Sequence, residues 1–343
     1  MPLLVVDGNA VSRTWTLTRD AEQRICAEAP PGWTTYFVRA QTSSDGDGPR
    51  GSSAEVLREI PNADVYLGFG IPRPLFLAAN KLRWVHSAAA GVGNALYPEM
   101  RDGDVILTNS AGVHAIPIAE YIVGSVLYLF RGFDIAVDQQ RRAEWNKEPF
   151  VGDASPLREV GGARVLIVGA GGIGTEAARR LSALGAQCVG VRRRAQLGAP
   201  EGFARVIGFD GIDAEIPSAD AIVLSAPLTE QTRGLLDARR MDHLKRSAIV
   251  INVARGALTD ESALIERLRS GRIRGAALDV FQEEPLASDS PLWQLRSVLV
   301  TPHISPVSPG RFWARELDLF LDNWHRFVRG DALRNLVDKR AGY

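Results

Sequence analysis

Arg255, Glu284 and His303 each stand shortly after an apolar segment in the second half of the chain. Together these side chains could catalyse the reduction of a carbonyl group by hydride. A histidine titrates near neutral pH and can donate a proton to the developing alkoxide. A carboxylate on the other ring nitrogen would orient the histidine and keep it protonated to higher pH. An arginine would clamp a substrate carboxylate and polarise the keto oxygen.

Taken singly, each of these residues also has an ordinary structural explanation. A lone arginine is usually solvated, and a glutamate before a proline is commonly part of a turn. A lone histidine is usually a satisfied side chain, and we expect the remaining four histidines to be of this structural kind: His86, His114, His243 and His325. The catalytic interpretation depends on all three residues meeting at one edge of a sheet.

A glycine-rich segment upstream predicts a dinucleotide site. Gly169, Gly171 and Gly174 have the spacing G-x-G-x-x-G, between the apolar run 165–168 and a helical pattern that Gly185 ends. The first glycine would allow a tight turn, the second would let a pyrophosphate approach the backbone, and the third would let the helix pack closely on the strand. Backbone N–H groups at the start of the helix would hold the phosphates, so the predicted set also includes the intervening residues, Gly172 and Ile173.

Three arginines follow the second predicted strand of this unit, 187–191, where an NAD site usually carries an acidic residue about 20 positions after the glycines. They are Arg192, Arg193 and Arg194. Guanidinium groups there would suit the 2′-phosphate of NADP(H) and would leave the 2′-hydroxyl of NAD(H) without an acceptor. A solvated basic loop is the alternative. We predict NADP(H) as the cofactor, with NAD(H) as a possible one.

Strand and helix signals alternate through this half, which indicates a doubly wound parallel sheet. Further strands are expected at 205–207, 221–224, 248–252, 275–278 and 298–300, with a helix at 260–270 that Thr259 would cap. Ligands bind beyond the carboxyl ends of such strands. We therefore assign Ala226, Pro227 and Ala254 to the cofactor site.

The first third of the chain alternates in the same way, without a second phosphate loop. Strands are expected at 3–6, 35–38, 64–67, 83–86 and 105–107, a helix at 54–60, and a polar loop that need not be ordered at 41–53. The small residues of 88–93 are either a packing turn or a backbone nest for a carboxylate. This unit is expected to bind the substrate, and an amphipathic helix at 309–329 is expected to return to it.

Composition limits the class of protein. The chain has 343 residues, which suggests two domains, and its 40 basic and 40 acidic residues balance. That balance favours neither a nucleic-acid nor a membrane partner. Two cysteines make a disulfide framework improbable, no metal site is expected, and the start of the chain does not read as a signal peptide. The most apolar helix candidate, 115–130, is short for a membrane span and contains Pro117 and Glu120. We expect a buried helix there and a cytoplasmic protein.

The motifs NVARGALTDE, LDVFQEEPL, DSPLW and VLVTPHIS, with GAGGIG upstream, resemble those of the D-isomer-specific 2-hydroxyacid dehydrogenases over residues 64 to 330. The resemblance implies an α/β fold of two Rossmann-like domains with doubly wound parallel sheets. An NAD(P)-binding domain, 111–303, would be inserted in a split substrate domain made of 1–110 and 304–343. It also implies a homodimer, formed through the region around 115–130.

The same resemblance implies roles for individual residues. Arg255, Glu284 and His303 match the active site, with Arg255 and His303 also binding substrate, and Asp279 matches the position that holds the nicotinamide carboxamide. The loop that binds the substrate carboxylate corresponds to Ala90, Gly91 and Val92. Asn94 stands near the end of this loop where an aspartate is usual after the valine, and 305–309 is unusually rich in proline. Both departures leave the substrate open.

The leading hypothesis is a reductase that converts a small 2-keto acid, such as glyoxylate or hydroxypyruvate, to the D-2-hydroxy acid with NADPH. An NAD-dependent D-2-hydroxyacid dehydrogenase, such as a 3-phosphoglycerate dehydrogenase, is an alternative that the three arginines oppose. A non-catalytic protein that senses dinucleotides is a further alternative, because such a protein can retain the same three catalytic residues.

Overall fold

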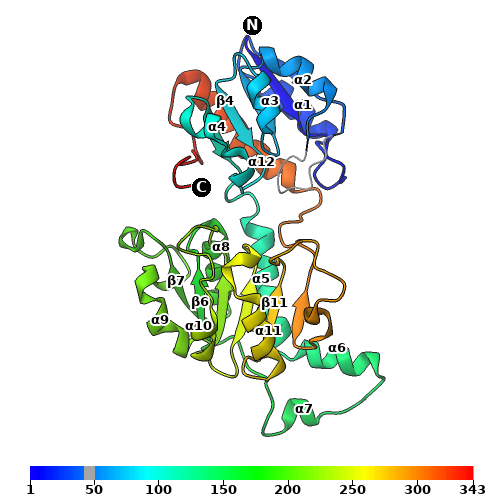
Figure 1. Cartoon of the computed structure of the whole chain (residues 1–343), viewed down its shortest axis with the longest axis vertical. Coiled ribbons are helices and arrows are strands. Elements are labelled where there is room, and N and C mark those ends of the chain that lie inside the picture. Colours follow the sequence, from blue (N-terminus) through cyan, green and yellow to red (C-terminus); the bar gives the residue numbers. More distant parts are fainter. Residues whose placement is uncertain (42–50, 343) are drawn as a thin grey trace. The chain divides into compact units, whose positions relative to one another are not determined.

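The computed structural model describes residues 1–41 and 51–342. The chain forms two compact units: unit 1 is Met1–His114 with Val307–Tyr343, and unit 2 is Ala115–Pro306. In Figure 1 the blue and red ends of the chain lie together in unit 1, and the green-to-orange middle forms unit 2. Unit 2 is thus inserted within unit 1, as expected, and the expected junctions after residues 110 and 303 lie within a few residues of those observed.

Unit 1 contains a five-stranded parallel sheet of order β2-β1-β3-β4-β5. Its strands are β1 (Leu3–Asp7), β2 (Thr34–Phe37), β3 (Val65–Gly68), β4 (Trp84–Ser87) and β5 (Ile106–Asn109). Its helices are α1 (Arg19–Ala27), α2 (Ala54–Glu59), α3 (Arg73–Ala78), α4 (Pro98–Asp102) and α12 (Phe312–Arg329).

Side chains alternate between the two faces of this sheet. Leu4 and Val6 of β1 pack in a core with α1 and α12, whereas Val5 packs in a second core with α2 and α3. The aromatic stripe of α12, which includes Trp313, Phe320 and Trp324, lies in the first core. The expectation that this helix returns to complete the first domain is therefore confirmed.

Unit 2 contains a seven-stranded parallel sheet of order β12-β11-β10-β9-β6-β7-β8. The strands are β6 (Arg164–Val168), β7 (Gln187–Val191), β8 (Phe203–Ile207), β9 (Ala221–Leu224), β10 (Ile249–Asn252), β11 (Gly275–Leu278) and β12 (Val298–Val300). The helices are α5 (Ala115–Phe130), α6 (Phe133–Arg141), α7 (Glu148–Val151), α8 (Gly172–Ala183), α9 (Ile212–Glu215), α10 (Ala238–Asp242) and α11 (Glu261–Arg269). The strand order reverses between β6 and β9, which is where ligands bind in doubly wound sheets.

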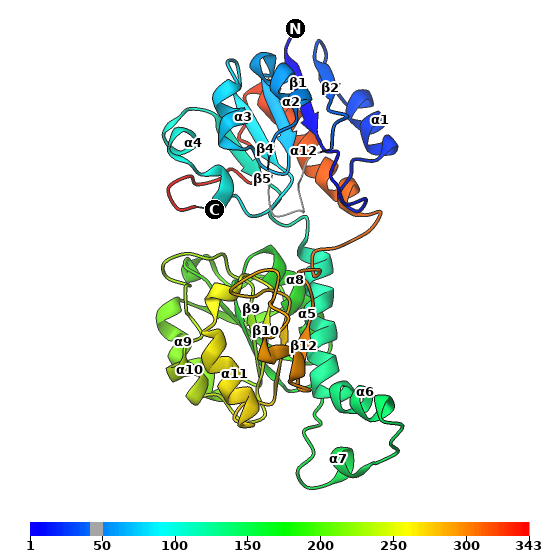
Figure 2. The same cartoon turned by 45° about the vertical axis from the view of Figure 1, so that its right-hand side comes forward.

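Helices cover both faces of this second sheet. Residues of α5 and α8 pack on one face, and residues of α9, α10 and α11 pack on the other. This is the doubly wound α/β fold that the alternating pattern predicts. Figure 2 shows that the segment carrying α6 and α7 extends from the end of α5, away from the sheet.

The helix α5 lies where the sequence places it, and much of it is buried in unit 2. Within residues 1–41 and 51–342, no single helix has the length and apolar character needed to cross a membrane. By length and composition alone, α5 and α6 together would meet this requirement, as a helix pair bent by 69°.

Two expected helix starts differ from the structure. The side chain of Asp260, not that of Thr259, caps α11 by accepting a hydrogen bond from the N–H of Ala263. Thr259 instead pairs with Leu236 in an isolated parallel β-bridge. The final helix begins at Phe312 rather than at 309, because Gly310 has a left-handed φ of +72°. The greater part of the expected polar loop 41–53 lies outside the described residues.

Candidate active site

The carboxyl edge of the unit 2 sheet brings the three predicted catalytic residues to neighbouring strands. Arg255 follows β10, Glu284 follows β11 and His303 follows β12, and these strands are adjacent in the order β12-β11-β10. Because the strands are parallel, the residues that follow them share one edge. Neighbouring strands explain how residues so far apart in sequence can form one site.

A direct hydrogen bond joins His303 and Glu284. The distance from His303 Nδ1 to Glu284 Oε2 is 2.8 Å, and Glu284 Oε1 accepts the N–H of Phe281 at 2.9 Å. Both carboxylate oxygens are thus engaged, which fixes the plane of the carboxylate and, through it, the orientation of the imidazole. The two side chains are 21% and 34% exposed, so a small ligand could reach them.

The electrostatics of this pair favour an ionised glutamate. Burial by itself would raise the pKa of Glu284, but the hydrogen bonds from His303 and from the Phe281 N–H, with the nearby charges of His303 and Arg255, lower that pKa below its ordinary value. A carboxylate that stays ionised stabilises the protonated imidazole beside it. This arrangement suits a histidine that acts as a general acid.

The loop that carries His303 is held by Asp279, directly after β11. Its carboxylate is completely buried. It accepts hydrogen bonds from Thr301 Oγ1 at 2.5 Å, from the N–H of Ile304 at 2.8 Å and from the N–H of Ser305 at 2.9 Å. The expected contact of Asp279 with a nicotinamide carboxamide stays a prediction. The observed contacts assign to Asp279 the support of the His303 loop.

Sequence reasoning missed two residues that extend this support. Tyr121 of α5 lies 2.8 Å from Thr301 Oγ1, and because Thr301 donates to Asp279, Tyr121 is the donor to Thr301. Burial, the first of several influences, raises the pKa of Tyr121 to about 12, so its hydroxyl stays protonated. Thr301 belongs to the motif around His303, whereas the local sequence around Tyr121 carries no signal for this role.

Arg255 is an exposed residue at the start of a short 3-10 turn, Gly256–Leu258. Its backbone is held because Asn252 Nδ2 donates to the Arg255 carbonyl at 3.0 Å. Its guanidinium donates to the carbonyl of Ala254 at 2.7 Å. The positive charge of Arg255 contributes to the lowered pKa of Glu284, which places these two groups within electrostatic range.

The glycine segment has the backbone geometry that its spacing predicts. Gly169 has a φ of +108°, and a Cβ there would lie 2.6 Å from the backbone nitrogen of Ala226. A Cβ on Gly174 would lie 2.0 Å from the carbonyl oxygen of Gly169, so α8 packs on the turn as closely as only glycine permits. Gly172 begins α8, and Gly171 caps it without a side chain. The first N–H groups of α8, which include Ile173, therefore point away from the helix toward a place for phosphate, and phosphate binding itself stays a prediction.

The three arginines after β7 differ in their surroundings. Arg192 is half-buried, and its guanidinium donates to the carbonyl of Gly198 at 2.5 Å. Arg193 and Arg194 are exposed. The structure therefore gives Arg192 a role in its own loop, and the exposure of Arg193 and Arg194 allows a ligand to reach them. Ala226 and Ala254 are buried at the sheet edge and Pro227 is exposed there, so backbone contacts are what the two alanines can offer a cofactor.

In unit 1, the predicted carboxylate loop follows β4. The N–H groups of Ala90, Gly91 and Val92 have no acceptor among the described residues. The Ala90 carbonyl, by contrast, accepts a hydrogen bond from Asn109 Nδ2 at 2.8 Å. Unpaired N–H groups of successive residues can bind an anion. None of residues 90–93 has a left-handed φ, and the nest stays a prediction.

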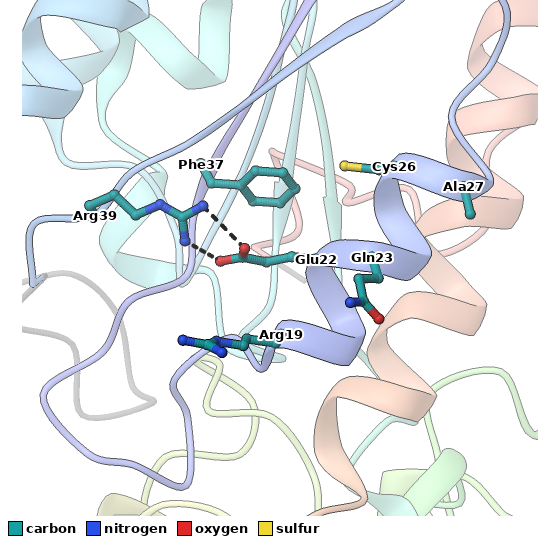
Figure 3. A pocket seen from close by; sticks show the side chains of 7 residues that line it. All are labelled: Arg19, Glu22, Gln23, Cys26, Ala27, Phe37 and Arg39. Carbon is teal, nitrogen blue, oxygen red and sulfur yellow. Dashed lines mark hydrogen bonds and ion pairs between the residues drawn. The ribbon is translucent and has the colours of Figure 1, made fainter.

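A hollow on the surface of unit 1 is formed by residues outside the predicted active site. An open hollow of about 860 Å³ on unit 1, drawn in Figure 3, contains none of the predicted site residues. It is lined by Arg19, Glu22, Gln23, Cys26, Ala27, Phe37 and Arg39. The ion pair between Arg39 and Glu22 lies within it, and Arg19 adds a further positive charge to its lining. No cluster of three or more possible metal-binding side chains occurs in the part of the chain that the structure describes.

Comparison with known proteins finds relatives of similar sequence. A D-3-phosphoglycerate dehydrogenase from Methanocaldococcus jannaschii is 34% identical over 290 residues, which cover 83% of this chain and 53% of that protein. The chain therefore spans about half the length of this relative.

Two solved structures resemble the whole chain. A D-isomer specific 2-hydroxyacid dehydrogenase from Xanthobacter autotrophicus, in complex with NADPH and MES, is 30% identical with a TM-score of 0.79, covering 100% of this chain and 99% of that one. An NADPH-dependent glyoxylate/hydroxypyruvate reductase from Sinorhizobium meliloti, in complex with NADP and sulfate, is 27% identical with a TM-score of 0.77, covering 100% of both chains.

The family model for the NAD-binding domain of D-isomer specific 2-hydroxyacid dehydrogenases matches residues 123–305, which is more than half of the chain. These residues contain the glycine turn and all three predicted catalytic side chains. The chain therefore belongs to the D-isomer specific 2-hydroxyacid dehydrogenase family.

Proposed function

We propose that this protein reduces a small 2-keto acid, such as glyoxylate or hydroxypyruvate, to the D-2-hydroxy acid. The observation that carries the proposal is the hydrogen bond between His303 and Glu284 on the sheet edge that also holds Arg255. His303 would donate a proton to the C2 oxygen, and Glu284 would hold the imidazole and stabilise its charge. Arg255 would bind the substrate carboxylate. In unit 1, the N–H groups of the Ala90–Val92 loop are also proposed as donors to a carboxylate.

NADPH is the cofactor we propose, with NADH as a possible substitute. When bound, it would supply the hydride that reduces the carbonyl carbon. The glycine turn and the first N–H groups of α8 fit a pyrophosphate, because a Cβ on Gly171 would meet nothing within 4 Å, so the space in front of the helix is open. The exposed guanidiniums of Arg193 and Arg194 fit a 2′-phosphate. Both structures compared above contain NADPH or NADP.

A second candidate is an NAD-dependent dehydrogenase that acts on a hydroxy acid such as 3-phosphoglycerate. The 34% identity to a D-3-phosphoglycerate dehydrogenase favours this candidate. The arginines after β7 oppose it, because they stand where NAD binding would place a carboxylate. We also propose that the protein is a homodimer, and its cytoplasmic location stays a prediction.

A panel of 2-keto acids assayed with NADPH and with NADH tests the proposal. Absorbance of the reduced nicotinamide reports turnover, and 3-phosphoglycerate with NAD in the oxidative direction tests the second candidate. We expect the highest kcat/KM for a two- or three-carbon 2-keto acid with NADPH. Turnover confined to 3-phosphoglycerate and NAD would reject the proposed function in favour of the second candidate.

A further inference from the structure

His86 lies in the interior of unit 1, on the strand that leads into the carboxylate loop. It is the third residue of β4, and both it and Glu316 of α12 are completely buried. Nδ1 of His86 is 2.6 Å from Thr108 Oγ1 on the neighbouring strand β5, and Nε2 is 2.9 Å from Glu316 Oε1. The ring is thus held from both sides, by a strand and by a helix that is distant in sequence.

The His86–Glu316 pair lies next to the hydrogen bonds that hold the carboxylate loop, Ala90–Val92. The hydroxyl of Ser110, 3.5 Å from His86 Nε2, donates to the Ser87 carbonyl at 2.8 Å. The N–H of Ser110 donates to the Ala89 carbonyl at 3.3 Å, and Asn109 Nδ2 holds the carbonyl of Ala90. The end of β5 therefore holds two carbonyls of the loop, those of Ala89 and Ala90, by hydrogen bonds. The His86–Thr108 bond joins β4 to β5 just before this point.

Stability alone is a weak reason for such a pair. Burying a carboxylate is costly, and an apolar pair of similar volume is often at least as stabilising. Here Glu316 Oε2 has no hydrogen-bond partner among the described residues, which adds to the cost of burying it. A purely structural site would be served better by two apolar side chains.

We propose that His86, held by Glu316, is a positioning residue for the loop that binds the substrate carboxylate. It fixes the end of β5 against β4, so that Asn109 and Ser110 hold the loop with the N–H groups of Ala90–Val92 directed outward. The inference rests on the proposed function, since it assigns the substrate carboxylate to this loop. It predicts that the pair controls affinity for the keto acid and leaves affinity for the dinucleotide unchanged.

The decisive variant replaces both partners with apolar residues, His86→Leu with Glu316→Leu, so that neither charged group is left unpaired, and Thr108 keeps the hydrogen bond from Trp84 Nε1. We expect an unchanged melting temperature, a KM for glyoxylate raised about tenfold or more, and an unchanged KM for NADPH. Glu316→Gln is the matched control, because its amide oxygen can still accept from His86. Its KM for glyoxylate should stay near that of the wild type. A double variant with the wild-type KM would overturn the inference.

Two further measurements keep the test decisive. If the double variant does not fold, Ser110→Ala removes only the hydroxyl that holds Ser87 and should also raise the KM for glyoxylate without changing that for NADPH. Calorimetric binding of oxalate to the NADPH-loaded protein requires no turnover. A wild type that reduces no 2-keto acid contradicts the proposed function, whereas oxalate binding that is equal in wild type and variants contradicts the positioning role.

Discussion

His303 has a backbone φ of +54°, in the left-handed region that few non-glycine residues adopt, although histidine, asparagine and aspartate adopt it more often than other residues do. A strained conformation persists only where surrounding contacts hold it. Here two backbone N–H groups are held by Asp279. The N–H of His303 donates to the Asp279 carbonyl, and the N–H of Ile304 donates to the Asp279 carboxylate. The strain therefore serves to present the imidazole at the sheet edge toward Glu284.

Replacing His303 with alanine tests the proton donor. We expect kcat to fall by about 100-fold or more, the usual cost of losing a general acid, while the dissociation constant for NADPH stays unchanged. Stopped-flow reduction of glyoxylate and fluorescence titration with NADPH measure the two quantities. His325→Ala, on α12 in unit 1, is the matched control and should keep normal turnover. Near-normal kcat for His303→Ala would remove it from the mechanism.

The exposed arginines after β7 test the choice of cofactor. Arg193→Ser with Arg194→Ser should raise the KM for NADPH about tenfold or more and leave that for NADH nearly unchanged, because only NADPH carries the 2′-phosphate. Arg269→Ser, an exposed arginine at the end of α11, controls for the loss of surface charge. Equal losses for both dinucleotides would show that these arginines do not recognise the 2′-phosphate.

At the scale of elements, local patterns were sufficient for most of the fold. The buried runs of β6 and β10 and the apolar pattern of α5 carry their own signals, and α5 spans the predicted residues. The cap of α11 was missed because two adjacent residues could both serve as caps, and only the bridge to Leu236 decides between them.

The supporting contacts of the site could not be predicted, because they join distant parts of the chain. Tyr121 and Thr301 are 180 residues apart, and His86 and Glu316 are 230 residues apart. No periodicity within one element relates such pairs. The meeting of the three predicted catalytic side chains at one edge could be predicted because each follows a strand, and a parallel sheet brings the ends of its strands together.

Asp279 holds the loop that follows β12 and carries His303, and a variant of Asp279 tests this role. Asp279→Asn replaces one acceptor oxygen with a donor, which faces N–H groups that are already donors. We expect kcat to fall about tenfold or more through misplacement of His303, with the protein still folded. Thr301→Val removes only the hydroxyl bond and should have a smaller effect on kcat. If both variants had wild-type kcat, Asp279 would not position the loop.

Asp7, at the end of β1, is expected to make the stability of the protein depend on pH. Burial, reinforced by the charge of Glu55 and only partly offset by the hydrogen bond from Tyr66, raises the pKa of Asp7 from 3.8 to about 6. Because the folded state binds this proton more tightly, the resulting stabilisation is complete below pH 3.8 and is lost as pH rises through about 6. A shift of this size corresponds to about 3 kcal/mol.

Asp7→Asn removes this dependence. We expect its melting temperature to exceed that of the wild type at pH 8 and to approach or fall below it near pH 4.5. Calorimetric melting across that pH range measures the difference. Asp102→Asn, an exposed site at the end of α4, should leave the wild-type pH profile unchanged. Parallel pH profiles for wild type and Asp7→Asn would show that Asp7 does not titrate in the folded protein near pH 6.

At the scale of the whole molecule, the segment from α6 to α7 carries exposed apolar side chains that a partner could cover. It extends away from the sheet of unit 2 in both Figures 1 and 2. Trp145 on this segment is 92% exposed, and Val151 and Phe133 are also exposed. Large apolar side chains gathered on an extended segment are typical of a protein–protein contact. A second copy of the chain is the partner that the proposed homodimer supplies, and a two-fold interface would use the segment of each copy.

Trp145→Asp with Val151→Asp would place charges in that contact, and we expect the protein to sediment as a monomer where the wild type sediments as a dimer. Charge in an apolar interface is costly to desolvate, so dissociation should be complete rather than partial. Trp293→Asp is the matched control, because Trp293 is exposed on a different segment, after β11. A wild type that sediments as a monomer would contradict the homodimer. A variant that remains dimeric would instead move the interface away from this segment, toward the exposed face of α5.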